Sequence, residues 1–224
     1  MAEFVFISAK NRARYLRIIT PIGNLFARMG IHPHALSITG FLLSIAAGIV
    51  YGEGAFFWAA WVVVLAGTCD ALDGQIARQT KKNSPFGAFF DSTLDRYSDI
   101  FLFMGLAYHF AGGQGFAGVQ GVHMLREPRP LTVVIIILAI AGSFMVSYTR
   151  ARAEGLGLEC RKGMMQRPER MTLLIIGSLL GSIPKVGHLL ITCTLLLLAL
   201  SSNLTALYRI FFIKDQLLRN NQIK

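Results

Sequence analysis

Charged residues and cysteines are both scarce in this sequence. Only 15% of its 224 residues are charged, whereas 54% are hydrophobic and the mean hydropathy is +0.53. This composition excludes an ordinary water-soluble protein and indicates an integral membrane protein that is too short for several large domains. The three cysteines have neither paired nor metal-ligand spacing, so we expect reduced, structural thiols at Cys69, Cys160 and Cys193.

Acidic residues are the scarcer of the two charged kinds. The chain has 12 Asp and Glu against 22 Lys and Arg, which gives a net charge of +10. Because the basic residues lie between apolar stretches, they favour anionic membrane lipids and phosphorylated substrates over nucleic acid. No cleavable signal peptide, internal repeat or low-complexity segment is evident.

Six apolar stretches approach or exceed the length of about 20 residues that crosses a bilayer as a helix. We predict spans at 34–52, 55–78, 87–111, 130–153, 170–184 and 186–211, the last two joined tightly through Pro184 and Lys185. Residues 1–33 mix basic and apolar side chains, which predicts an interfacial amphipathic helix, with a disordered basic tail as the alternative. The expected fold is an all-α integral membrane protein, with a juxtamembrane segment 1–33, a six-helix domain 34–212 and a C-terminal tail 213–224.

The distribution of basic residues predicts the orientation in the cell membrane, because cytoplasmic loops carry an excess of Lys and Arg. With the N-terminus inside, the cytoplasmic side collects Lys10, Arg12, Arg14, Arg17, Arg28, Arg78, Lys81, Lys82, the basic residues from Arg150 to Arg170, and Arg209, Lys214, Arg219 and Lys224. The opposite side keeps Arg126, Arg129 and Lys185. Both termini are therefore expected in the cytoplasm.

Four aspartates interrupt the second and third apolar stretches. Asp70 and Asp73 are three residues apart and Asp91 and Asp95 are four apart, so each pair projects from one face of a helix. An uncompensated carboxylate inside a bilayer is costly, so such a cluster requires cations. Oxygen ligands with little His or Cys nearby suit Mg²⁺ or Mn²⁺, and two ions would balance four charges.

The small and basic residues between these aspartates indicate a phosphate ligand. Gly74, Ala77 and Gly87 leave open space for a ligand or a neighbouring helix. Arg78 can reach a diphosphate with a planar fork of donors. Residues 70–95 therefore predict a nucleotide diphosphate site with bound metal, at the cytoplasmic end of two spans.

The same stretch resembles the defining motif of the CDP-alcohol phosphotransferases, integral membrane enzymes of phospholipid synthesis. Every fixed position of that motif is filled, by Asp70, Asp73, Gly74, Ala77, Arg78, Gly87, Asp91 and Asp95. The resemblance implies that the four aspartates hold the metals and that Asp95 is also the catalytic base. It further implies a CDP-lipid site that includes Pro33, His34, Ala35, Leu36, Gly74, Ala77, Arg78, Ser84 and Gly87, although His34 stands where the family usually has Asn.

A second polar stretch resembles a narrower branch of this family, the enzymes that make phosphatidylinositol phosphate or its archaeal ether-lipid counterpart. Two runs carry this resemblance, residues 147–154 and 167–170, with a further arginine at position 209. It implies that the phosphate of inositol phosphate is bound by Arg150, Arg152, Arg170 and Arg209. We expect Arg161, Lys162 and Arg167 to be surface charges, and Asp99 to support the site or the packing of its helix.

The resemblance implies a homodimeric enzyme that moves the phosphatidyl group of CDP-diacylglycerol, or of an archaeal CDP-lipid, to inositol phosphate and releases CMP. The same chemistry with glycerol 3-phosphate as acceptor is the alternative. A divalent-cation transporter is a more distant one, because carboxylates on facing membrane helices also suit an ion pathway. Against a transporter, the aspartates gather at one membrane face and the arginine-rich loop would repel cations.

Overall fold

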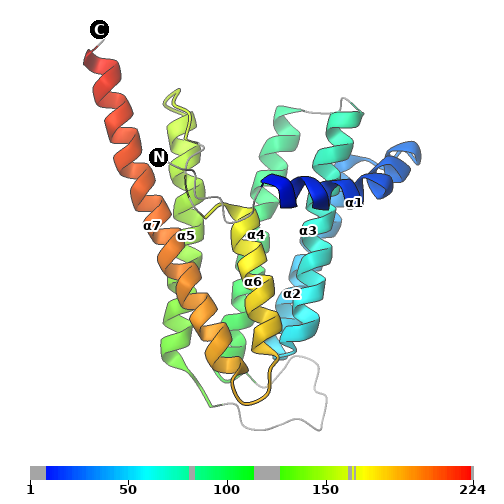
Figure 1. The fold of residues 1–224 in the computed structure, drawn as a ribbon, viewed down its shortest axis with the longest axis vertical. Helices are drawn as coiled ribbons and strands as arrows, with labels where there is room; N and C mark the ends of the chain where they lie inside the picture. The colour runs from blue at the N-terminus through cyan, green and yellow to red at the C-terminus, as the bar shows by residue number, and fades with distance from the viewer. Residues whose placement is uncertain (1–8, 81–83, 114–126, 161–162, 164, 223–224) are drawn as a thin grey trace.

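The computed structural model of the protein describes residues 9–80, 84–113, 127–160, 163 and 165–222, and within these ranges it is entirely helical. Its helices are α1 (Ala9–Arg28), α2 (Pro33–Gly52), α3 (Phe56–Gln79), α4 (Pro85–Phe110), α5 (Pro130–Glu154), α6 (Arg167–Gly181) and α7 (Gly187–Gln222). Helices α2 to α7 run along the long direction of the molecule, whereas α1 lies across it (Figure 1).

Prolines and a capping serine determine where several helices begin. Pro33, Pro85 and Pro130 are the first residues of α2, α4 and α5. An N–H at this position has no acceptor within the helix, so a proline there costs no hydrogen bond. Ser84 caps α4, because its hydroxyl accepts a hydrogen bond from the Gly87 amide at 2.9 Å. The start of α4, which carries two of the four aspartates, is therefore well defined locally.

The helices agree with the predicted membrane architecture in its main features. In the described part of the chain, α2, α3, α5 and α7 are long and apolar enough to cross a membrane. Helix α4 has 26 residues but contains several charged side chains, and α6 has only 15 residues. An all-helical protein with long apolar helices is thus confirmed, and six complete spans stay a prediction.

Helix α1 occupies most of the segment predicted to be an amphipathic helix. It packs on α2 and α3 through a small core in which Ile19 meets Leu36, Leu72 and Ile76. Residues 1–8 of the predicted segment lie outside the described residues. Residues 9–28 are helical, and an interfacial amphipathic helix over 1–33 stays a prediction.

The main core lies where α2 to α7 meet, and it fixes α4 against α2. Its largest fully buried side chains include Tyr51, Phe103, Leu106, Phe110, Leu174, Ile191 and Leu195. A Cβ atom placed on Gly105 of α4 would overlap the carbonyl oxygen of Gly48 of α2. Only glycine allows two helix backbones to approach this closely.

Many large apolar side chains lie on the outer surface of the helices. Examples with at least half of their area exposed are Trp58, Leu65, Leu131, Leu138, Leu189 and Leu204. Water-soluble proteins rarely expose so much contiguous apolar surface, whereas lipid-facing helices require it.

One end of the molecule gathers the basic helix termini. The end of α3, the start of α4, the end of α5 and the C-terminal part of α7 lie toward the top of Figure 1, and α6 begins below them, near the middle of the view. The tail predicted at 213–224 continues α7 as far as Gln222. Lys81, Lys82, Arg126, Arg161, Lys162 and Lys224, which entered the orientation argument, lie outside the described residues.

Candidate functional site

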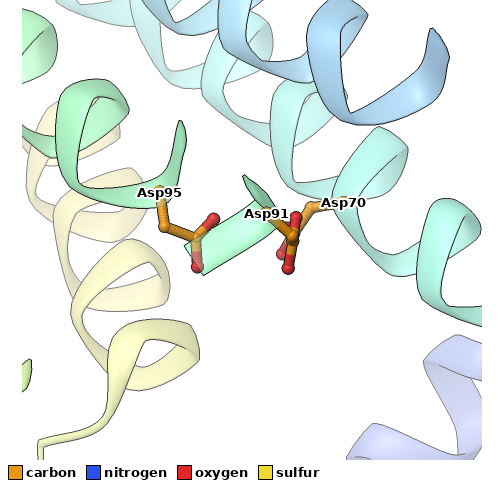
Figure 2. Close-up of side chains that lie close together, drawn as sticks. All are labelled: Asp70, Asp91 and Asp95. Atoms are coloured by element: carbon orange, nitrogen blue, oxygen red, sulfur yellow. The ribbon is translucent and has the colours of Figure 1, made fainter. Parts of the chain in front are cut away.

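Three of the four aspartates converge between α3 and α4. Asp70 projects from α3, and Asp91 and Asp95 project from α4, toward a common space (Figure 2). One carboxylate oxygen from each residue lies within 4.8 Å of the others. This all-oxygen donor set fits a hard divalent cation such as Mg²⁺ or Mn²⁺.

A small cavity adjoins these carboxylates and has the size of a bound ion or water. Its volume is about 10 Å³, and its wall includes Asp70, Asp91 and Asp95. A space of roughly this volume holds one water molecule. The carboxylate group therefore has both the ligand chemistry and the room that a metal ion needs.

Asp73 is not one of the three carboxylates that converge in the described part of the chain. Its Oδ2 accepts a hydrogen bond from the Ser37 hydroxyl of α2 at 2.6 Å, and only 6% of the residue is exposed. The bond ties α3 to α2 beside the carboxylate group. Metal ligation by Asp73 stays a prediction.

Arg167 supplies the positive charge within the carboxylate group. Its Nη1 lies 2.9 Å from Asp70 Oδ2 and 2.8 Å from Asp95 Oδ1, and 22% of its side chain is exposed. The prediction that Arg167 is a surface charge was therefore wrong. The predicted fifth span began at residue 170, whereas α6 begins at Arg167, with Pro168 as its second residue. Arg170 lies three residues further on, a spacing that places both arginines on one helix face.

Asp99 and Arg170 form a buried ion pair between α4 and α6. Arg170 Nη2 donates to Asp99 Oδ2 at 3.1 Å, and the two side chains are 3% and 5% exposed. Removing one partner of such a pair leaves an uncompensated buried charge, so both are needed for the packing. The supporting role expected for Asp99 is confirmed in this contact.

A larger cavity of about 500 Å³ also has Asp91 and Asp95 in its wall. The polar residues in its wall are Asp91, Ser92, Asp95, Arg96, Asp99, Ser147, Arg150, Glu154, Gln166, Arg167, Arg170 and Arg209. The aspartates come from α4, whereas the arginines other than Arg96 come from α5, α6 and α7. The cavity therefore has a carboxylate side and a guanidinium side.

Three of the four arginines predicted to bind the acceptor line this cavity. Arg170 and Arg209 are buried, and Arg209 donates to the carbonyl oxygen of Val146. Arg150 is more exposed and pairs with Glu154 at 2.9 Å. Arg152 is exposed and is not part of the cavity wall. Arg96, which was not predicted as a site residue, also lines the cavity, and its Nη1 lies 3.8 Å from Asp95 Oδ2.

The residues predicted to bind the CDP-lipid lie around the starts of α2 and α4. A Cβ atom on Gly87 would lie 3.1 Å from His34 Cε1 and from Ser84 Oγ, so these three residues adjoin. The His34 ring also contacts Phe86 and Phe90 edge-on, with centroid distances of 6.1 and 5.6 Å. Position 34, which departs from the family pattern, thus joins α2 to α4.

The remaining predicted contacts lie along α2 and α3. Pro33 and Leu36 are buried in α2, with Ala35 between them. On α3, the guanidinium of Arg78 lies over Gly74, because a Cβ on that glycine would be 3.4 Å from Arg78 Nη1. Arg78 is itself exposed, and Ala77 beside it is half-buried.

All three cysteines are free, as predicted. Cys69 is half-buried next to Asp70. Cys160 is buried in the segment between α5 and α6, and this burial raises the pKa of its thiol. The thiol of Cys160 is therefore neutral at physiological pH.

The family model described as CDP-alcohol phosphatidyltransferase matches residues 30–213. The chain therefore belongs to the CDP-alcohol phosphatidyltransferase family and is a phosphatidyltransferase. This membership excludes the cation transporter that the aspartates alone left open.

Relatives from two domains of life match most of the chain. The phosphatidylinositol phosphate synthase of Streptomyces avermitilis is 32% identical over 211 residues, which cover 92% of this chain and 81% of that protein. The archaetidylinositol phosphate synthase of Methanothermobacter thermautotrophicus is 37% identical over 165 residues, 74% of this chain and 73% of that protein.

Solved structures share the fold. The phosphatidylinositol phosphate synthase of Mycobacterium tuberculosis with CDP-DAG bound has a TM-score of 0.74 at 32% identity, covering 88% of this chain and 94% of that one. The same enzyme in complex with manganese and citrate also has a TM-score of 0.74, at 30% identity, covering 87% of this chain and 88% of that one.

Proposed function

We propose that the protein transfers the phosphatidyl group of CDP-diacylglycerol, or of an archaeal CDP-linked ether lipid, to a hydroxyl of inositol phosphate and releases CMP. One observation carries this proposal: the 500 Å³ cavity joins Asp91 and Asp95 to a wall of arginines. The names of the bacterial and archaeal relatives support the choice of acceptor.

The metal would be Mg²⁺ or Mn²⁺, held by Asp70, Asp91 and Asp95 together with Asp73. Two ions would balance these four carboxylates, and the manganese complex of the mycobacterial enzyme supports a divalent metal. When bound, the metal neutralises the diphosphate and stabilises the charge that develops on the leaving CMP.

The CDP-lipid would lie on the small residues of α3 and α4. Arg78 would bind the diphosphate above Gly74 and Ala77, since its guanidinium already lies over that face. Gly87 and Ser84 would border the nucleotide, together with the segment from Pro33 to Leu36.

Asp91 and Asp95 both belong to the carboxylate group and to the wall of the large cavity, and Asp95 is the better placed base because it also contacts Arg167 of the arginine wall. An acceptor hydroxyl in that cavity would meet its carboxylate, which would take the proton as the hydroxyl oxygen attacks phosphorus. Asp91 lines the same wall but lies a turn further from Asp99 and the arginines.

Arg150, Arg170 and Arg209 would bind the acceptor's phosphate. A phosphomonoester carries nearly two negative charges and three acceptor oxygens, which guanidinium groups bind in bidentate fashion. Arg170 and Arg209 are already held in place by Asp99 and by the Val146 carbonyl. Such fixed donors lose little conformational entropy when the phosphate binds.

The assay that tests this function uses purified protein, radiolabelled CDP-diacylglycerol and three acceptors: inositol phosphate, free inositol and glycerol 3-phosphate. We expect CMP release and lipid product with inositol phosphate only in the presence of Mg²⁺ or Mn²⁺. Full turnover in excess chelator would refute the requirement for a divalent metal. A preference for glycerol 3-phosphate would establish the alternative acceptor.

For the membrane arrangement we propose six spans, with both termini and the site in the cytoplasm, in a homodimer. The basic helix ends near the site support this orientation. Cysteine labelling tests it, with Glu159→Cys and Lys185→Cys in a cysteine-free background. Label should reach position 159 from the cytoplasmic side only and position 185 from the outer side only. Crosslinking in native membranes tests the dimer.

A further inference from the structure

Arg167 contacts two of the three carboxylates that form the candidate metal site. A single nitrogen, Nη1, lies within 2.9 Å of both Asp70 and Asp95. These are the residues whose oxygens converge with that of Asp91 to within 4.8 Å. The small cavity beside them has Arg167 as well as the three aspartates in its wall. A divalent ion bound there would share its ligands with a guanidinium.

The two cations would repel each other strongly at this separation, in a site with limited access to water. Each carboxylate oxygen that donates electron density to a metal is also less available to an N–H donor. The guanidinium and the metal therefore compete for Asp70 and Asp95, and binding of one disfavours the other.

Release of the Arg167 side chain would leave α6 in place, because this helix also packs on α3 and α7. That helix is held to α4 by Arg170 and Asp99, one turn further on. Arg167 Nε is buried and forms no hydrogen bond in the described part of the chain. In its present position the guanidinium therefore leaves one of its N–H donors without an acceptor. The nearest other carboxylate is Asp99, whose Oδ1 lies 3.8 Å from this Nε. The arginine also borders the large cavity, which gives its guanidinium room to move.

We propose that Arg167 is an internal counter-ion that neutralises Asp70 and Asp95 while the site is metal-free and is displaced by the divalent ion. The inference rests on the metal site of the proposed function. Displacement turns the guanidinium toward the large cavity, where the acceptor's phosphate is proposed to bind. Metal binding thus adds the Arg167 guanidinium to the arginines that bind the acceptor's phosphate. Binding of the metal and binding of the acceptor therefore become coupled.

Binding of Mn²⁺ to the full-length protein in detergent tests the competition, measured from the electron paramagnetic resonance signal of free Mn²⁺. Arg167→Gln removes the charge and both ion pairs, so Mn²⁺ should bind about 10- to 100-fold more tightly. Arg167→Lys keeps the charge without the planar fork, and its affinity should fall between those two proteins. The matched control is Arg219→Gln, which removes an exposed ion pair with Asp215 far along α7 and should leave the affinity unchanged.

Thermal unfolding adds a second readout that does not involve turnover. Without metal, Arg167→Gln leaves the carboxylates uncompensated and should unfold at a lower temperature than the wild type. Its stabilisation by Mn²⁺ should exceed that of the wild type. Recovery of folded Arg167→Gln only in the presence of Mn²⁺ would support the counter-ion role in the same way.

The outcomes separate this role from the proposed function. If the wild type binds Mn²⁺ and loses it on Asp91→Asn, but Arg167→Gln binds no more tightly, the counter-ion role is overturned and the metal site stands. If the wild type shows no saturable Mn²⁺ binding, both are overturned. If Arg167→Gln fails to fold with and without Mn²⁺, the Mn²⁺ affinity of Arg167→Lys is the test. If Arg167→Lys binds Mn²⁺ no more tightly than the wild type, the counter-ion role is overturned.

Discussion

The carboxylate group and the arginine wall of the large cavity are built in opposite ways. Asp70, Asp91 and Asp95 come from the end of α3 and the start of α4, which follow each other closely in the chain. The arginines come from three helices, α5, α6 and α7, which are brought together by packing alone. Both of these helices pack on α2, so the carboxylate geometry needs one helix besides their own, whereas the arginine wall depends on three helices from more distant parts of the chain.

The two regions also differ in how their charges are compensated. Arg170 and Arg209 are almost fully buried and have fixed partners of their own, Asp99 and a backbone carbonyl. The carboxylates are only half-buried, and their compensating charge is an arginine side chain at the edge of a cavity. The first arrangement suits a rigid phosphate-binding wall, and the second suits an exchangeable cation.

The largest effect is expected at Asp95, the proposed base, which belongs to both regions. Asp95→Asn keeps the size of the side chain but removes the proposed base, so kcat should fall by at least about 100-fold. Binding of CDP-diacylglycerol, measured separately by calorimetry, should persist. Asp215→Asn, on the exposed part of α7, is the control. Near-normal turnover in Asp95→Asn would assign the base to another group.

A smaller effect, confined to one substrate, is expected in the arginine wall. Arg170→Lys keeps the charge opposite Asp99 but cannot bind a phosphate in bidentate fashion. Loss of one charge-assisted contact should raise the KM for inositol phosphate by roughly 10- to 150-fold. The KM for CDP-diacylglycerol should change by less than about twofold, because that lipid is bound by the other region. Equal damage to both substrates would show that the regions are not separate.

The smallest effects distinguish two arginines on α5. Arg150 lines the cavity, whereas Arg152 does not. Arg150→Gln should raise the KM for inositol phosphate by roughly fivefold, less than a buried arginine because its exposed charge is screened by water. Arg152→Gln should change that KM by less than about twofold. Steady-state kinetics give the KM for inositol phosphate in both variants. A larger rise in that KM for Arg152→Gln than for Arg150→Gln would mean that α5 turns when the acceptor binds.

The local region was the more predictable from sequence. Asp70, Asp91 and Asp95 lie on two consecutive helices, so their spacing predicts that they face one another once both helices pack on α2. The hydrogen bond that turns Asp73 toward Ser37 was not predictable, because it depends on where α2 packs against α3. The helices themselves followed from apolar length and proline positions, with boundaries within a few residues except where α7 extends further.

The arginine region was predicted less well, for reasons that particular residues make clear. Arg150 and Arg152 are two positions apart, and residues at that spacing do not share a helix face. The same geometry would have grouped Arg167 with Arg170, had α6 been recognised as beginning before Pro168. That Arg167 meets Asp70 follows only from the approach of α6 to α3 and α4, which no local pattern encodes.

The close contact between Gly48 and Gly105 fixes the distance between α2 and α4 at one point along α4. Asp95 lies ten residues from Gly105, about 15 Å along the helix axis. A methyl group on Gly105 would overlap the Gly48 carbonyl and force α4 away from α2. If α4 tilts as a rigid helix, its residues near the aspartates would move further than Gly105 itself. The alignment of the reacting groups is thus set at a distance, by two residues that have no side chain and take no part in the chemistry.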